Sequence, residues 1–121
     1  MDWRHEAGRA AERAARSLLE RHGLTFIDAN YRCRQGEIDL IMRDGAVLVF
    51  VEVRLRSESR FGSGADSVTQ TKRRRIIATA THFLSKLHGP LPYCRFDVVS
   101  VSRPNYRPEL NWIRDAFTHD G

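Results

Sequence analysis

Acidic residues gather at one end of a predicted β-hairpin, where they could bind a metal ion. Residues 36–54 read GEIDLIMRDGAVLVFVEVR, two apolar halves separated by Asp44-Gly45, a dipeptide typical of a two-residue turn. The end away from this turn carries Glu37, Asp39, Glu52 and Arg54. Carboxylate oxygens are the ligands that Mg²⁺ and Mn²⁺ prefer, so this end of the hairpin is a candidate metal site.

The turn also sets an expected register for the two strands. With residues 44–45 as the loop, Glu37 is expected opposite Glu52, and Asp39 opposite Phe50. Asp39 and Glu52 are then diagonal neighbours with Cβ atoms about 7 Å apart, close enough for both carboxylates to bind one cation. A slip of one residue would move Glu52 to the other face of the hairpin.

This register assigns one wholly apolar face of the hairpin to the core. That face carries Ile38, Leu40, Met42, Val47, Val49, Val51 and Val53. The other face carries Ile41, Leu48 and Phe50 near the turn and the four charged residues at the far end. We expect this second face to be half covered and half open.

Three carboxylates crowded on one face require positive charge beside them. A divalent cation is one source of that charge. The alternative is a carboxylate cluster without a metal, paired with Arg34, Arg54 and Arg56 at a solvated sheet edge. The residues alone leave both interpretations open.

Glu12 is a further candidate carboxylate. It lies at the edge of the apolar stripe of a helix predicted over residues 3–22, so its side chain could face the charged end of the hairpin. The alternative is a surface ion pair with Arg16, four residues further along the same helix.

A second helix is predicted from a cap at Asp66 or Ser67 to about His88. Its first turns carry Lys72, Arg73, Arg74 and Arg75. Positive charge opposes the helix dipole at an N-terminus, whereas a phosphate bound there would be stabilised by free amides and basic side chains. The alternative is a solvated basic face.

These segments belong to a predicted α/β fold. Further strands are expected over residues 24–33 and 95–102 and, in short form, over 110–114, with a polar loop over 55–66. The order of helix, three strands, helix, strand and short C-terminal strand predicts a small mixed sheet flanked by helices. We expect one domain over residues 1–121, with a core at about 8–103 and a tail over 104–121.

The composition favours an anionic partner. Twenty Lys and Arg against fifteen Asp and Glu give a formal charge of +5, which suits nucleic acid, although an ordinary basic protein is the alternative.

No apolar run approaches the roughly 20 residues that cross a bilayer. Cys33 and Cys94, without an apolar N-terminal leader, indicate the cytoplasm, and the cysteines and histidines lack zinc-ligand spacing.

Several short strings in this sequence also occur together in a known family. They are GRAAE at 8–12, NYR at 30–32, GEIDLI at 36–41, FVEVR at 50–54, Phe61-Gly62, Lys72 and RFDVV at 95–99, with a weaker match in NWI at 111–113. In this combination the chain resembles the YraN family of small bacterial proteins. That family resembles the Holliday junction resolvase-like branch of the PD-(D/E)xK nuclease superfamily. The resemblance covers roughly residues 8–101 and implies a restriction endonuclease-like core.

The resemblance implies a metal-dependent endonuclease acting on DNA, with branched or structured DNA as its substrate class. Asp39 and Glu52 would bind Mg²⁺ or Mn²⁺ together with the carbonyl of Val53, and Glu12 would complete or support the site. The phosphate-binding residues would be Arg34, Arg56, Lys72, Arg73, Arg74 and Arg75. By analogy with resolvases the assembly would be a homodimer.

Arg54 departs from the superfamily pattern, which has lysine at this position. We expect Arg54 in the catalytic set with Glu12, Asp39 and Glu52, but arginine stays protonated and cannot act as a base. Lys72 is our candidate for the missing lysine. Two other functions remain open: a DNA-binding protein of the same fold that cleaves nothing, and a protein-interaction module.

Overall fold

The computed structural model describes residues 3–56, 68–103 and 106–118, with only the backbone described for 3–5. In chain order the elements are α1 (Trp3–Arg21), β1 (Thr25–Cys33), β2 (Gly36–Asp44), β3 (Val47–Leu55), α2 (Gln70–Leu84), β4 (Cys94–Ser102) and β5 (Glu109–Phe117). The predicted α/β order is confirmed. Most of the predicted loop at 55–66, the pair Phe61-Gly62 and the predicted caps Asp66 and Ser67 lie outside the described residues.

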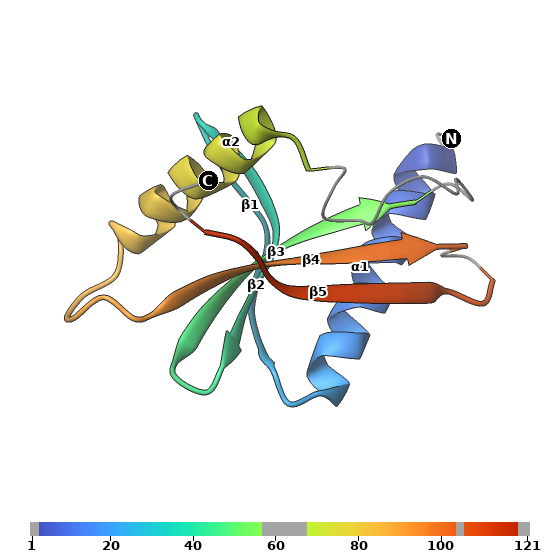
Figure 1. Ribbon diagram of the computed structural model, residues 1–121, viewed down its shortest axis with the longest axis horizontal. Coiled ribbons are helices and arrows are strands. Elements are labelled where there is room, and N and C mark those ends of the chain that lie inside the picture. Colours follow the sequence, from blue (N-terminus) through green and yellow to red (C-terminus); the bar gives the residue numbers. More distant parts are fainter. Residues whose placement is uncertain (1–2, 57–67, 104–105, 119–121) are drawn as a thin grey trace.

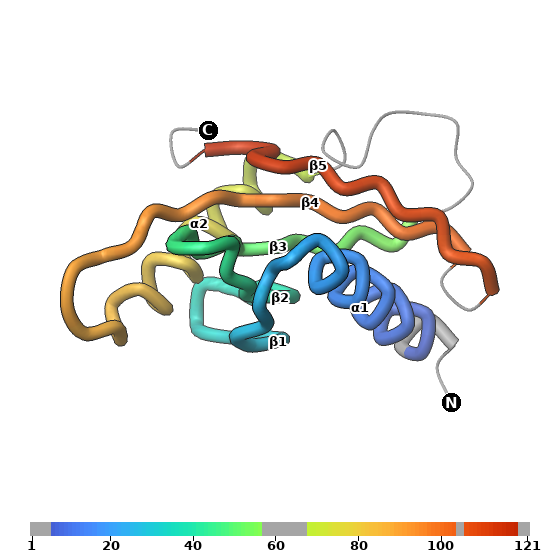
Figure 2. Tube along the Cα trace, turned by 90° about the horizontal axis from the view of Figure 1, so that it is seen from below, coloured from blue at the N-terminus to red at the C-terminus, as the bar shows by residue number. Residues whose placement is uncertain are grey.

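The five strands form one mixed sheet in the order β1-β2-β3-β4-β5. Only β3 and β4 are parallel, and α2 lies between them in the chain, as a parallel connection requires. Figure 1 shows α2 at the upper left and α1 on the right of the crossing strands, and Figure 2 shows the strands following one another from β5 to β1. The last strand was predicted over five residues but has nine, because it pairs along most of β4.

Helix α1 packs on one face of the sheet through small and apolar residues. Ala11, Ala15 and Leu19 are buried there, at the helical spacing that predicted this element. The helix ends where predicted: Gly23 has φ +91°, and its N–H donates to the carbonyl of Glu20. This left-handed cap lets the chain turn directly into β1.

Helix α2 is capped by Thr69, whose hydroxyl accepts a hydrogen bond from the Lys72 N–H at 3.1 Å. The helix ends at Leu84, four residues before the predicted end near His88. Its last turn tightens, since the Lys86 N–H donates to the carbonyl of Phe83 only three residues back. Residues 85–93 include no buried side chain that would hold a further turn against the sheet.

The two helices cover opposite faces of the sheet, so the core has two layers. The expected apolar face is confirmed under α1, where Leu40, Met42, Val49 and Val51 are buried. Ile38 is an exception, because it packs in the cluster under α2. On the second face, Ile41, Leu48 and Phe50 are buried together with Ile76 and Ala80 of α2. The half-covered face that we expected is thus closed over its apolar part by α2.

The hairpin register differs from the prediction by two residues. Asp44 pairs with Val47, so the turn residues are Gly45 and Ala46, and Ile41 rather than Asp39 lies opposite Phe50. Gly45 has φ +60°, the conformation of the first central residue in a type II′ turn. Because side chains alternate with a period of two, this shift by itself moves no residue of the hairpin to the other face, and Ile38 is the one buried residue that departs from its predicted face.

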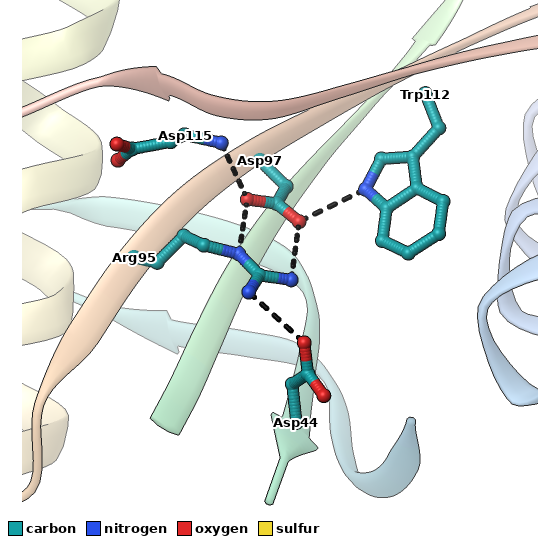
Figure 3. A network of polar contacts seen from close by, with 5 residues as sticks. All are labelled: Asp44, Arg95, Asp97, Trp112 and Asp115. Atoms are coloured by element: carbon teal, nitrogen blue, oxygen red, sulfur yellow. Dashed lines mark hydrogen bonds and ion pairs between the residues drawn. The ribbon is translucent and has the colours of Figure 1, made fainter. Parts of the chain in front are cut away.

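A network of ion pairs and hydrogen bonds around the buried Asp97 connects β4 with β5 and with the hairpin turn (Figure 3). Asp97 is fully buried, and its carboxylate accepts hydrogen bonds from the Arg95 guanidinium, the Trp112 indole and the Asp115 backbone N–H. Arg95 also pairs with Asp44 at 3.0 Å. These contacts join β4 to β5 and to the hairpin turn, which gives the RFDVV string at 95–99 a structural role.

Candidate active site at the open end of the hairpin

The pairing of β2 with β3 stops at Leu40 and Val51. One step beyond, the Asp39 carboxylate accepts a hydrogen bond of 2.8 Å from the Val53 N–H. A side chain therefore satisfies a backbone donor that the partner strand no longer reaches. The predicted opposition of Glu37 and Glu52 is wrong, because continuing the observed register places Asp39 opposite Glu52. The two candidate ligands are thus direct rather than diagonal neighbours.

Glu52 is almost fully buried, with 4% of its surface exposed. Its Oε1 atom lies 2.5 Å from the Nζ atom of Lys72, in the first turn of α2. A buried carboxylate of this kind requires a positive partner, since desolvation is otherwise too costly. Lys72 was expected near the site only from its place in the sequence, and the structure brings its ammonium group directly to a candidate metal ligand.

Asp39 and Glu52 form a coupled acidic pair. Burial, followed by the negative charge of Glu52, raises the pKa of the Asp39 carboxyl to about 8, although the hydrogen bond from the Val53 N–H acts in the opposite direction. Two carboxylates held this close resist being ionised together. The pair therefore holds a proton near neutral pH unless additional positive charge reaches it.

Glu12 approaches the same cluster from α1. Burial raises the pKa of its carboxyl, a side-chain hydrogen bond with Asn30 lowers it, and the charges of Glu37 and Glu52 raise it again. Glu12 does not form the alternative pair with Arg16, which instead contacts Glu20 at 3.4 Å. The helical carboxylate thus lies within electrostatic reach of the hairpin carboxylates, as predicted.

A pocket of about 410 Å³ opens over the carboxylates beneath the start of α2. Its lining comprises Gly36, Glu37, Asp39, Glu52, Thr69, Thr71, Lys72, Arg75 and Ile76. Gly36 allows this close approach of strand and helix, because a Cβ atom there would lie 3.2 Å from Oγ1 of the buried Thr79. Acidic groups from the sheet and basic groups from the helix therefore face one cavity.

The predicted phosphate-binding residues divide into two groups. Lys72 and Arg75 share the helix face that lines the pocket, as their spacing of three residues requires. Arg73 lies elsewhere, since its Nε atom donates to the carbonyl of Val68 and its guanidinium lies 5.5 Å from the centre of the Phe117 ring. Arg74 is exposed on the helix.

The remaining predicted arginines do not line this pocket. Arg34 is exposed at the turn between β1 and β2, and Arg54 and Arg56 are half-buried at the end of β3. Glu52 contacts Lys72 and Glu37 contacts Arg32 at 2.5 Å, so two of the acidic residues have a positive partner outside the predicted set of Arg34, Arg54 and Arg56.

The residues that our sequence reasoning missed are Asn30, Arg32, Gly36, Thr69 and Thr71. Asn30 has φ +54°, a left-handed conformation that asparagine tolerates better than most residues, within a strand. It was noted only as part of a matching string. Its polar side chain, at a position where a strand pattern favours a β-branched residue, was the available signal for a special role.

The donor set of this pocket suits a hard divalent cation held by few protein ligands. In the described residues no three His, Cys, Asp or Glu side chains converge on one point, so a complete protein cage is not formed there. Mg²⁺ commonly uses only one or two carboxylates and completes its shell with water and substrate phosphate. Asp39 and Glu52 meet that requirement, whereas the carbonyl of Val53 as a third ligand remains a prediction.

Comparison with known proteins gives one consistent result. The sequence model of "Uncharacterised protein family UPF0102" matches residues 11–101. The UPF0102 protein NE0719 of Nitrosomonas europaea is 51% identical over 110 residues, covering 91% of this chain and 92% of that protein. The UPF0102 protein XCV0816 of Xanthomonas euvesicatoria is 51% identical over 119 residues, covering 97% and 95%. Separately, no helix in the described ranges is long and apolar enough to cross a membrane.

Proposed function

This chain belongs to the uncharacterised protein family UPF0102, the YraN family that its motifs predicted, and we propose that it is a metal-dependent endonuclease hydrolysing phosphodiester bonds in DNA. Branched or otherwise structured DNA is the substrate class that the resemblance to resolvases implies. The relation to that nuclease superfamily is part of this proposal.

One observation supports the proposal above the others: the Lys72 ammonium lies 2.5 Å from the buried Glu52 carboxylate, in a pocket that also contains Asp39. A lysine and two carboxylates around one cavity are the side chains that metal-assisted phosphoryl transfer needs. A structural ion pair alone would not require an open pocket of this volume beside it.

The residues fit Mg²⁺ or Mn²⁺ by donor type, since Asp39 and Glu52 supply hard oxygen ligands. A divalent cation bound there would polarise the scissile phosphate and lower the pKa of a bound water molecule. It would also supply the positive charge that the coupled carboxylates lack, which would favour the ionised form of Asp39.

In this proposal the protein's own residues orient the metal ligands and bind the phosphate. The Val53 N–H holds the Asp39 carboxylate in one orientation. Lys72 and Arg75, on the pocket-facing side of α2, would bind the phosphate oxygens and neutralise the charge that develops on them. Glu12, approaching from α1, would orient the ligand cluster through its negative charge.

Lys72 could also replace the lysine that the superfamily pattern has at position 54, where this chain has arginine. Arginine stays protonated and is bulkier than lysine, whereas a lysine ammonium is a compact charge that fits beside the carboxylates. We propose that Lys72, placed by α2, takes the part of the lysine that the superfamily pattern has on the strand. Arg54 is retained as a group that neutralises phosphate charge.

The second candidate function is a DNA-binding protein that cleaves nothing. The arginine at position 54 favours it, because the usual lysine is absent from the strand. The two functions share the basic residues of α2 at the pocket and therefore both predict DNA binding that weakens with salt. Only cleavage separates them.

The decisive experiment measures cleavage of labelled duplex, single-stranded, flap and four-way junction DNA with Mg²⁺ or Mn²⁺. We expect metal-dependent cutting by the wild type that is lost in Asp39→Ala and in Glu52→Ala. Lys72→Ala should reduce the rate at least about 100-fold, the usual contribution of a positioned acid or base. Lys86→Ala is the matched control, since it removes the only other lysine of the chain.

Salt-sensitive binding without any cutting, in both the wild type and Arg54→Lys, would exclude the nuclease and support the binding protein. If Lys72→Ala still cuts DNA at the wild-type rate, Lys72 has no catalytic role. Absence of both binding and cutting would exclude both functions and favour a protein-interaction module.

Compartment and assembly belong to the same proposal. We propose a cytoplasmic protein, because Cys33 and Cys94 are both free thiols and the proposed substrate is DNA. A homodimer is proposed by analogy with resolvases that act on symmetric junctions.

A further inference from the structure

A second basic surface lies on α1, away from the residues considered so far for phosphate binding. Arg9, Arg13 and Arg16 stand on one side of the helix at spacings of three and four residues, together with Glu12. They line a shallow pocket of about 220 Å³ with Ala29, Asn30 and Leu40. Glu12 therefore belongs both to this surface and to the acidic cluster at the hairpin end.

The three arginines are not equally engaged. Arg16 stacks on the Phe26 ring with its guanidinium 3.6 Å from the ring centre, and it also contacts Glu20. Arg9 and Arg13 are exposed, and among the described residues neither has an ion-pair or aromatic partner. Neither guanidinium is therefore engaged in an ion pair within the described residues, and both are accessible to an anion from solvent.

Glu12 would be the obvious partner for a neighbouring arginine on the helix. Its side chain is instead held by Asn30 of β1, in a left-handed conformation that places this asparagine against the helix. The contact turns Glu12 towards the hairpin carboxylates and leaves Arg9 and Arg13 facing solvent. An ordinary solvated face would more simply pair Glu12 with an arginine one turn away.

The open end of the hairpin separates two basic surfaces. Lys72 and Arg75 of α2 line the pocket on one side of the acidic cluster, and Arg9 and Arg13 of α1 line the pocket on the other. The helices cover opposite faces of the sheet, and the pairing of β2 with β3 ends at this point (Figure 1). A polyanion lying across the carboxylates would therefore meet positive charge in both directions.

We propose that Arg9 and Arg13 bind the sugar–phosphate backbone of the same nucleic-acid strand whose neighbouring phosphate lies at the α2 pocket. This inference rests on the proposed function and extends it: the substrate is held on both sides of the scissile position. Arginine suits this task, because its planar guanidinium can contact phosphate oxygens in a bidentate manner.

The test measures binding of a labelled single-stranded oligonucleotide, and of the matching duplex, at several salt concentrations with EDTA present to prevent cleavage. For the single strand we expect Arg9→Ala/Arg13→Ala to weaken binding about tenfold and to lower the slope of log K against log salt by about 0.7 for each lost phosphate contact. Arg9→Lys/Arg13→Lys should retain the wild-type slope, because it keeps both charges.

The matched control is Arg21→Ala/Arg43→Ala, which removes the same charge. Arg21 ends α1 and Arg43 lies next to the hairpin turn, at the end of the hairpin away from Asp39 and Glu52, and both are exposed. We expect this control to bind within about twofold of the wild type, since unspecific charge effects at exposed sites are small and screened by salt.

Equal losses in the α1 variant and in the control would overturn the α1 surface, because only net charge would then matter. If the wild type cuts DNA and the α1 variant binds and cuts equally well, the inference fails while the nuclease stands. If the wild type binds neither oligonucleotide, the proposed function fails and the α1 surface with it.

Discussion

Replacing Asp39 by asparagine should stabilise the metal-free protein at alkaline pH. Asparagine keeps the oxygen that accepts the Val53 N–H, so the hydrogen bond survives and only the ionisable group is lost. The variant gains stability because ionised Asp39 is unfavourable in the folded protein, where burial and the charge of Glu52 raise the pKa of its carboxyl to about 8. Active sites commonly store destabilisation of this kind.

The sign follows from proton linkage. The folded protein holds a proton on Asp39 that the unfolded chain, with an ordinary aspartate, releases near pH 4. Stability is therefore highest at low pH and falls as the pH rises towards the folded pKa of about 8. One proton contributes at most about 1.4 kcal/mol for each pH unit, which gives an upper limit of about 4 kcal/mol between pH 5 and pH 8. Because Lys72 and solvent screen the pair, we expect about 2 kcal/mol.

The assay is urea denaturation of wild type and Asp39→Asn at pH 5, 7 and 9 with EDTA present. The difference in free energy of unfolding should be small at pH 5 and should favour the variant increasingly at higher pH. Asp115→Asn is the control, because it removes one exposed carboxylate elsewhere. Parallel pH profiles for wild type and Asp39→Asn, or a variant that is less stable at pH 9, would refute the description of this acidic pair.

Three further variants test how the site is held in place. Asp97→Asn should lower the free energy of unfolding by about 3 kcal/mol in chemical denaturation, since it faces several donors with an amide and leaves the partly buried Arg95 guanidinium with Asp44 as its remaining charge partner; a loss below about 1 kcal/mol would contradict this. Gly36→Ala should cost about 1–3 kcal/mol, because its Cβ atom would crowd Thr79, and an unchanged melting temperature would show that α2 can move away freely. Thr69→Ala should cost about 1 kcal/mol and raise hydrogen exchange at the Lys72 amide, and wild-type exchange there would exclude the cap.

The order of the elements could be predicted from the sequence because it depends on local periodicity. The helical spacing of Ala11, Ala15 and Leu19 and the alternation in residues 36–54 each specify an element and its buried face. The hairpin faces were right except at Ile38 even though the register was wrong, since an error of two residues preserves the alternation. The turn was misplaced because Asp44-Gly45 and Gly45-Ala46 are both acceptable loop pairs.

The acidic half of the site was also visible in the sequence. Asp39 and Glu52 lie on one hairpin, so a short-range pattern was sufficient to bring them together, and family motifs pointed to the same residues. Glu12 could only be placed on a favourable helix edge. Its orientation depends on Asn30, and the side chain that fixes it comes from a different element.

Only the tertiary structure decided which basic residue faces the carboxylates. Lys72 meets Glu52 because the crossover between β3 and β4 brings the start of α2 back over the open end of the hairpin, and because Gly36 permits the close approach. No periodicity encodes that contact, since it depends on how two elements pack. The sequence by itself determined which side chains were available and which faces they occupy. Packing determined which lysine faces which carboxylate, and with it the chemistry that this pocket can support.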